Sequence, residues 1–431
     1  MDDQESTQTT FIDRLILEDK LLLIGWSLLI IWIGGFIFHH AAAKRMVSKK
    51  NVILGRDFIT FYFAGIIIKE NNGQRIYEEK LQKRVQDSIV APEKVKGVAY
   101  YINPASVAVL YSPLTNLPYL YAFFLHTILM FLFSLIAIQI LKPNLPGLAS
   151  QWTAVLLISI TWFPMMHSIL GGQNAALCML LLAIAYKATV NEQQMLAGVA
   201  LGFLFFKPQY TLPPLGLLLL RKKFITFLSA VLVGMGHYLL GAAFCGWNWP
   251  SKMVASISGF YGAWERVASG ATHISIKEVI DFSIIQPLQR HGDAQVIVQF
   301  FKIFTYLLIL SGIFYLIWIW QKADVRNRDF GLYWAIVSSV TLLISLHTQY
   351  YDTALLIIPL ILIINHQVIT NKQIPGMHKL IMALVYILSP FIYLFEVGKI
   401  MGFQPLVLLP LWVTLWAATI IHKKNPSQER P

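Results

Sequence analysis

Residues 143–186 read PNLPGLASQWTAVLLISITWFPMMHSILGGQNAALCMLLLAIAY and contain no Asp, Glu, Lys or Arg. About 20 apolar residues are enough for a helix to cross a bilayer, so this stretch is long enough to cross twice. Two further windows without charge cover 102–141 and 224–251. A water-soluble protein of this size has no use for so many long uncharged segments. The sequence therefore predicts an all-α polytopic membrane protein.

The composition of the 431-residue chain agrees, because 56% of its residues are hydrophobic and only 13% are charged. Soluble domains carry about 25% charged residues. The net charge of +12 would suit a nucleic-acid-binding protein, but no basic stretch is interleaved with aromatic residues, so we exclude that class. Cys178 and Cys245 lie in apolar segments without metal-ligand spacing. We therefore predict no disulfide framework. We name no cofactor and no metal ligands, and the need for a metal stays open.

The apolar segments divide the chain into spans, and we expect about 10–12 transmembrane helices within 21–421. The candidate spans are 21–39, 119–141, 151–168, 174–190, 224–246, 298–320, 330–346, 353–370, 380–398 and 403–421. Two polar regions, 41–104 and 247–297, are long enough to form loops outside the bilayer, and the first is the larger. Residues 1–20 are predicted to form a polar N-terminal segment, and 422–431 a short tail.

One mostly apolar segment, 195–220, does not fit a single straight helix, because Lys207 and Pro208 stand at its middle. A lysine at bilayer depth costs about 2.5–3.5 kcal/mol, and a proline inside a helix removes a hydrogen bond and clashes with the preceding turn. We expect an interrupted segment, either a re-entrant hairpin or two short helices. A ligand anion would serve as partner for Lys207, although the side chain could also snorkel. Since its charge is costly, Lys207→Met is expected to leave the protein folded.

The basic residues indicate the orientation of the chain. If 195–220 crosses an even number of times, most basic short loops fall on one side, which the positive-inside rule makes cytoplasmic. These loops contain Lys187, Arg221, Lys222, Lys223, Lys322, Arg326, Arg328, Lys372 and Lys379. Both termini are then cytoplasmic, and the two long polar regions face outward. Lys44, Arg45, Lys49 and Lys50 break the rule, which long translocated loops largely escape.

Ionisable residues in or beside spans mark function by default, and Asp57 is the first of them. It precedes Phe58, Phe61 and Tyr62, a spacing typical of a helix lying at the membrane interface, where aromatic rings gather. A carboxylate here suits chemistry at the membrane surface. The alternative is that Asp57 only caps the helix, since Asp is a good N-cap.

Further polar groups lie at expected outer ends of spans. One is the run Gly171-Gly172-Gln173-Asn174, whose glycines allow a close backbone approach to a ligand. Another runs from His347 to Asp352. A tight turn and a hydrated loop are the plain structural alternatives for these two groups.

In chain order these motifs resemble those of glycosyltransferase family 87, whose members are GT-C-type membrane enzymes similar to polyprenol-phosphate-mannose-dependent mannosyltransferases. The resemblance rests on Asp57-Phe58, Phe61-Tyr62, Ala64-Gly65, Tyr77, Tyr101 with Pro104, Ser112-Pro113-Leu114, Gly172-Gln173-Asn174, Ala197-Gly198 and Lys207-Pro208-Gln209. It covers about 50–220 well; beyond that it rests on topology and on His347, Tyr351 and Asp352. The combination is fairly specific, whereas each motif alone is weak.

The resemblance implies a GT-C-like fold and the transfer of a hexose, most readily mannose, from a polyprenyl-phosphate-sugar donor to a lipid or glycan acceptor. The active site would face the periplasmic or extracytoplasmic side of the cell (inner) membrane. The resemblance implies Asp57 as catalytic base, and Lys207 and His347 as the candidates for binding the donor phosphate. The residues expected to bind substrate are Tyr62, Tyr101, Gln173, Asn174, Gln209 and Asp352. The late motif differs from that of the mannolipid enzymes, so the sugar and the acceptor stay open.

Two functions from other classes also stay open. Broken helices with charged midpoints are typical of transporters, so the chain could be a transporter or flippase of lipid-linked sugars. Transporters usually have two pseudo-symmetric halves, and this sequence has one interrupted segment. A non-catalytic assembly subunit is the other alternative.

Overall fold

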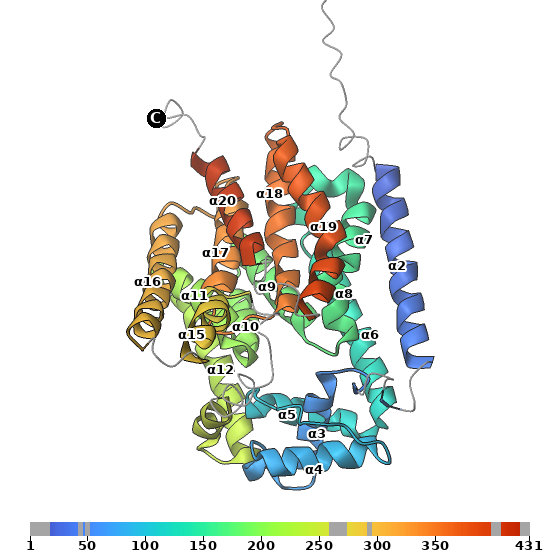
Figure 1. Ribbon diagram of the computed structural model, residues 1–431. Coiled ribbons are helices and arrows are strands. Elements are labelled where there is room, and N and C mark those ends of the chain that lie inside the picture. Colours follow the sequence, from blue (N-terminus) through green and yellow to red (C-terminus); the bar gives the residue numbers. More distant parts are fainter. Residues whose placement is uncertain are drawn as a thin grey trace, which may run out of the picture.

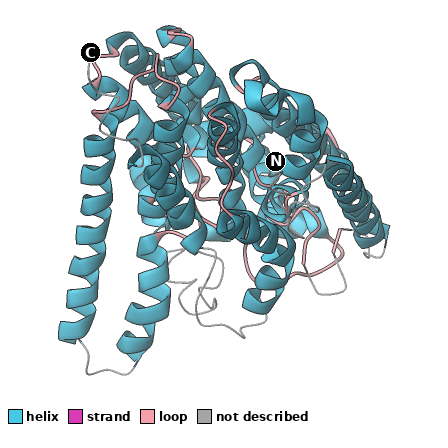
Figure 2. Cartoon of the chain, turned by 90° about the horizontal axis from the view of Figure 1, so that it is seen from above, coloured by secondary structure: helices cyan, strands magenta, loops and turns pink. Residues whose placement is uncertain are grey.

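Figure 1 shows the computed structural model, which describes residues 18–41, 46–47, 52–257, 274–290, 295–397 and 407–422. The described residues are mainly helical, and their extended pairing is limited to an isolated bridge between Val47 and Ile53. Seen from above, the described chain consists of helices joined by loops (Figure 2). The protein is an all-α polytopic membrane protein. Residues 1–17, the tail after 422 and the four basic residues after the first span lie outside the described residues.

Helices occur where the uncharged windows predict spans. These helices are α2 (Glu18–Ala41), α6 (Tyr119–Gln139), α9 (Ala175–Val190), α12 (Phe224–Cys245), α16 (Gln295–Trp320), α17 (Phe330–Ile344), α18 (Ile357–Ile369), α19 (Gly376–Val397) and α20 (Leu408–His422). In Figure 1, α2 and α16 stand at opposite edges of the bundle. The Trp32 indole on α2 donates a hydrogen bond to the Thr161 carbonyl at 3.2 Å, which ties this outer helix to the bundle.

Five of the described helices are long and apolar enough to cross a membrane, and a bent pair would make six. Six shorter apolar helices have 10–17 residues, and several of them pack inside the bundle. Helix α17 is an example, since nearly all of its side chains are buried. The expected 10–12 crossings would be reached only if such short helices also count.

The bent pair consists of α7 (Trp152–Thr161) and α8 (Phe163–Leu170), which meet at an angle of 56°. Pro164 lies in the first turn of α8, where its missing N–H and fixed backbone angle suit a helix start and would break a continuing helix. The segment expected as one span over 151–168 is therefore bent at Trp162.

A layer of shorter helices lies across one end of the upright bundle in Figure 1. It contains α3 (Phe58–Lys69), α4 (Glu79–Val90) and α5 (Ala105–Tyr111). Helix α3 is almost fully buried, whereas α4 is amphipathic and buries only its Leu81 face. Helices α3 and α4 belong to the first large polar region, and α5 follows directly after it.

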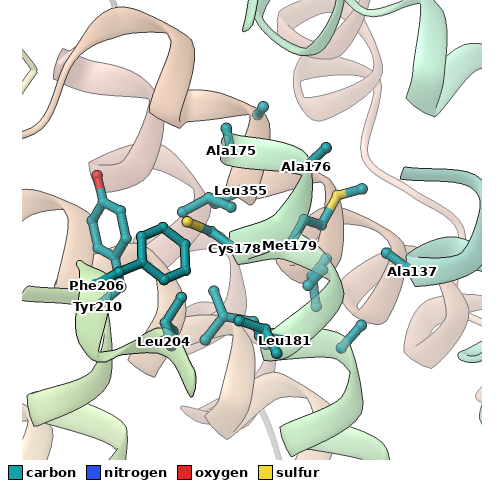
Figure 3. Close-up of a cluster of buried hydrophobic side chains, with 14 of the residues drawn as sticks. Ala137, Ala175, Ala176, Cys178, Met179, Leu181, Leu204, Phe206, Tyr210 and Leu355 are labelled. Atoms are coloured by element: carbon teal, nitrogen blue, oxygen red, sulfur yellow. The ribbon is translucent and has the colours of Figure 1, made fainter. Parts of the chain in front are cut away.

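The interrupted segment is split into α10 (Gln194–Phe203), the 3-10 helix η5 (Leu204–Phe206) and α11 (Pro208–Leu220), with Lys207 at the break. The break is fixed by its neighbours, since Phe206 and Tyr210 are buried in the core beside Cys178 and Leu355 (Figure 3).

Both ends of this segment lie beside the same loop. Glu192, just before α10, is 3.8 Å from Arg326, and Arg221, just after α11, donates a hydrogen bond to the Trp320 carbonyl at 2.7 Å. The chain therefore runs from this loop to Lys207 and returns. This geometry is that of a hairpin.

Candidate active site

A cavity of about 990 Å³ lies between the layer of short helices and the interrupted hairpin. Six of the nine candidate side chains line it, although they come from four separate parts of the sequence. These six are Asp57, Gln173, Lys207, Gln209, His347 and Asp352. The fold thus brings residues up to 295 positions apart to the lining of one cavity.

Asp57 stands at the N-terminus of α3, but its side chain makes no capping hydrogen bond. Its carboxylate oxygen Oδ2 instead accepts a hydrogen bond from the Gln173 amide at 2.5 Å. Its backbone N–H donates to the Gly171 carbonyl at 3.1 Å. The simple capping alternative for Asp57 therefore fails, and the carboxylate faces the cavity.

Gly172 allows the two chain segments to meet. Its φ is +75°, and a Cβ atom there would lie 2.5 Å from the Gly55 carbonyl oxygen and 2.5 Å from the Phe58 side chain. Arg56 also has a positive φ, of 35°, a conformation that costs a non-glycine residue energy and often occurs at functional sites. The glycines thus bring Gln173 to Asp57, where the sequence had suggested contact with a ligand.

Burial raises the pKa of the Asp57 carboxyl above its ordinary value. The hydrogen bond from Gln173 and the charges of Arg56 and Lys207 act in the opposite direction without cancelling this effect. A carboxylate with a raised pKa holds a proton more readily, which suits a general base working near neutral pH.

Lys207 has a partner within the protein. Its Nζ atom lies 2.9 Å from Oδ1 of Asp352, and both side chains are nearly buried, with 12% and 3% exposed. The rings of Tyr210 and Tyr351 lie 5.7 and 5.6 Å from the same Nζ, within range of a cation–π attraction. Lys207 therefore has an anionic partner, Asp352, without any ligand. The expectation that Lys207→Met leaves the protein folded took the lysine charge to be unpaired, and the structure pairs it.

Asp352 is held on its other side as well. Its Oδ2 accepts a hydrogen bond from the Gln349 backbone N–H at 3.0 Å, as part of a capping box at the start of the 3-10 helix η7 (Tyr350–Leu356). Both oxygens are thus engaged by the protein. The carboxylate lines the cavity, where it anchors Lys207.

His347 lies in the loop between α17 and η7, and its Nδ1 is 2.5 Å from Oε1 of Glu278. Burial disfavours a charge on the ring, but the carboxylates of Glu278 and, to a smaller extent, Asp352 act against it, and together they raise the pKa of His347. The imidazole is therefore biased toward its positively charged form at the cavity. The Gln209 amide lies nearby, 3.4 Å from the His347 carbonyl oxygen.

The model of glycosyltransferase family 87 matches residues 101–345, more than half of the chain. The chain belongs to glycosyltransferase family 87. It is a glycosyltransferase, as the motifs had indicated. No curated protein and no solved structure matches it. The family 87 match includes Gln173, Lys207 and Gln209, whereas Asp57 and the 347–352 loop lie outside it.

Three of the candidate side chains do not line the cavity of this family 87 protein. The Tyr62 hydroxyl donates to the Leu117 carbonyl at 2.7 Å, and the fully buried Tyr101 donates to the Pro104 carbonyl at 2.7 Å. Asn174 is buried at the start of α9. The hydroxyls of Tyr62 and Tyr101 are used by the fold, and none of the three side chains lines the cavity, so their contact with substrate stays a prediction.

A second wall of the cavity is formed by the extended segment 98–104. Two buried glutamines, one turn apart on α4, hold it. The Gln82 side chain accepts from the Tyr101 N–H at 3.1 Å, and the Gln86 side chain accepts from the Ala99 N–H at 2.8 Å. These contacts satisfy the backbone much as a neighbouring strand would, so the wall is fixed in place opposite the hairpin.

Much of the remaining lining is apolar, and two helices in contact with each other, α11 and α16, contribute an apolar slot. The residues of the slot are Leu212, Pro213, Gly216, Leu217 and Leu220 on α11, and Ile309, Ile313, Leu316 and Ile317 on α16. The slot and the polar side chains line the same cavity. Within the described ranges, no group of three His, Cys, Asp or Glu side chains could hold a metal ion.

Sequence reasoning missed Glu278, which is 1% exposed and contacts His347. The available signal was Ser275-Ile276-Lys277-Glu278, a pattern of the capping-box type before a helix. That pattern predicts a local helix start. It does not predict a partner 69 positions further along the chain.

Proposed function

We propose that this glycosyltransferase moves a hexose, mannose most readily, from a polyprenyl-phosphate-sugar donor to a lipid or glycan acceptor at the extracytoplasmic face of the cell membrane. The observation that carries the proposal is the lining of the cavity, which combines the side chains of Asp57, Lys207 and His347 with an apolar slot between α11 and α16. A donor with a charged head and an isoprenoid tail matches both kinds of lining, whereas a sugar nucleotide would leave the slot unused.

The donor phosphate would lie between Lys207 and His347. A phosphodiester buried in a membrane protein needs positive charge beside it, and each of these side chains already carries its own counter-ion, Asp352 or Glu278. The phosphate would therefore join two existing ion pairs. The tail would extend along Leu212 and the side chains that face it across the slot.

The acceptor hydroxyl would transfer its proton to Asp57 as its oxygen attacks C1 of the sugar. The bond from C1 to the phosphate oxygen breaks with its electron pair, and polyprenyl phosphate leaves. Retention of configuration would call for a second carboxylate as nucleophile, by analogy with glycosidases. Asp352 and Glu278 are engaged with Lys207 and His347, so a single displacement with inversion is the better-supported course.

Sugar transfer by the purified protein tests this function. The full chain in detergent, given a short-chain polyprenyl-phosphate mannose and a membrane glycolipid acceptor extract, should release polyprenyl phosphate and form a mannosylated product. GDP-mannose in place of the lipid donor is the matched control and should give none. A flippase would give no product in detergent, where no membrane separates two compartments, and that result would overturn the proposal.

The orientation can be tested by cysteine labelling of intact cells. Exposed Lys80 lies on α4 in the layer beside the cavity, whereas exposed Lys222 and Arg326 lie at the opposite end of the hairpin. On a background without Cys178 and Cys245, Lys80→Cys should react with an impermeant maleimide. Lys222→Cys and Arg326→Cys should react only after the cells are permeabilised, because basic short loops stay in the cytoplasm.

The opposite labelling pattern would place the cavity on the cytoplasmic side and would remove the extracytoplasmic part of the proposal. All three positions are solvent-exposed, so absence of labelling reflects sidedness. Labelling of all three after permeabilisation is the control for access.

A further inference from the structure

Glu278 is a buried carboxylate with both oxygens engaged. It lies on α14 (Ile276–Ile280), and 1% of its surface is exposed. Oε1 contacts Nδ1 of His347 at 2.5 Å, and Oε2 accepts a hydrogen bond from the Thr348 backbone N–H at 3.0 Å. The Glu278 side chain therefore contacts two consecutive residues, His347 and Thr348, of the loop that borders the cavity.

A local capping role does not account for this arrangement. The Ser275 hydroxyl caps α14 by accepting from the Glu278 N–H at 3.3 Å, and it donates to Oε2 at 3.1 Å. The carboxylate itself reaches away from its helix to the 347–348 loop. Burying an ionised carboxylate is costly unless it is paired, and the imidazole of His347 is the pairing group.

The charges around His347 come from three elements. Glu278 on α14 and Asp352 on η7 favour a positive ring, and Lys207 at the hairpin break opposes it. Asp352 is already paired with Lys207, so these two largely offset each other. Glu278 is then the group that decides whether the His347 ring is charged.

We propose that Glu278 is a positioning residue, which holds the His347 ring in place and keeps it positively charged at the donor phosphate. This inference rests on the proposed function, because it takes the phosphate to lie at His347. Glu278 does not itself touch the substrate. It acts through His347, in the way that a carboxylate fixes the tautomer and orientation of a histidine elsewhere.

Replacing Glu278 with Gln separates charge from shape. The amide oxygen can still accept from Thr348, but it cannot hold the ring charge, so His347 returns toward an ordinary or lower pKa. Binding of short-chain polyprenyl-phosphate mannose, without acceptor, should weaken about ten- to a hundredfold at pH 7.5. Binding should then strengthen as the pH is lowered from 7.5 to about 5, because protonation of His347 below its usual pKa of about 6.5 restores part of the lost charge.

The measurement is best made in the Asp57→Asn background, where the carboxyl of residue 57 no longer titrates. The donor is a phosphodiester and keeps its single negative charge over this range of pH. In a His347→Ala background, Glu278→Gln should have little further effect, because the two act as one unit.

The outcomes distinguish a failure of the role inferred for Glu278 from a failure of the proposed placement of the donor phosphate. A loss of donor binding by Glu278→Gln that is equal at both pH values, or that persists with His347→Ala, would make Glu278 purely structural and overturn this inference. Unchanged donor binding in His347→Ala alone would overturn the placement of the phosphate and not the role of Glu278 in holding the loop. If Glu278→Gln does not fold, NMR titration of His347 in the wild-type protein decides: a pKa at or below about 6.5 contradicts the inference.

Discussion

Replacing Asp57 with Asn should lower turnover by about 10²–10⁴-fold, the usual contribution of a general base. The Asn side chain keeps the shape of Asp and can still meet the Gln173 amide, but it cannot take a proton from the acceptor hydroxyl. Donor binding and thermal stability should change little, because the carboxylate makes no capping hydrogen bond to α3. The rate of product formation under saturating donor and acceptor measures the effect.

Asp87→Asn is the matched control. Asp87 lies on the exposed face of α4, where it pairs with Lys83, and such surface pairs contribute at most about 1 kcal/mol. Its turnover should stay near the wild-type value. Near-normal turnover in Asp57→Asn, or a product with the same anomeric configuration as the donor, would remove Asp57 from the role of base.

The pH dependence of the wild-type enzyme gives an independent check on the same residue. A base must be deprotonated to act, so turnover should fall as the pH drops through the pKa of Asp57. Burial raises that pKa, which places the acidic limb above the range usual for an exposed aspartate, about 3.9. An acidic limb at or below that value would contradict the buried environment of Asp57.

The membrane spans could be predicted because uncharged windows are a property of the local sequence. The break at Lys207 could also be predicted from the local sequence, since a lysine followed by a proline is unfavourable in any membrane helix. The bend at Trp162 was missed, although Pro164 marks it. A proline near the start of a helix is compatible with either a new helix or a kink, so the sequence alone did not decide between them.

The pairing of charges across the cavity could not be predicted in the same way. Lys207 and Asp352 are 145 positions apart, and Glu278 and His347 are 69 apart. Hydropathy fixes which segments are helical, but it does not say which helix ends meet. The sequence therefore named Lys207, His347 and Asp352 as candidates without showing that two of them pair with each other.

For Tyr62 and Tyr101 the sequence predicted a contact with substrate, but neither side chain lines the cavity. Tyr62 and Tyr101 are motif residues, and a polar aromatic beside a sugar site is a reasonable substrate contact. In the structure their hydroxyls are used by the carbonyls of Leu117 and Pro104. A buried tyrosine needs a hydrogen-bond partner, and here the fold supplies it, so these residues stabilise the first polar region.

Replacing Lys207 with Met alone should destabilise the protein strongly. The change leaves Asp352 buried, charged and unpaired, and breaking a buried ion pair in this way costs roughly 3–5 kcal/mol. Thermal unfolding in detergent should show a clear fall in Tm. The double variant Lys207→Met/Asp352→Asn has no charge left unpaired, and its amide oxygen can still accept from the Gln349 N–H, so most of the stability should return.

The same set of variants separates a structural lysine from one that binds the donor. If Lys207 meets the donor phosphate, the double variant should be stable yet bind polyprenyl-phosphate mannose much more weakly. In Asp352→Asn the lysine has lost its carboxylate, and the donor phosphate is the anion that can replace it. Because a ligand stabilises the folded state in proportion to its affinity, saturating donor should raise the Tm of Asp352→Asn by more than it raises that of the wild type. Equal donor-induced shifts in the two proteins, together with normal donor binding by the double variant, would make Lys207 a purely structural partner of Asp352.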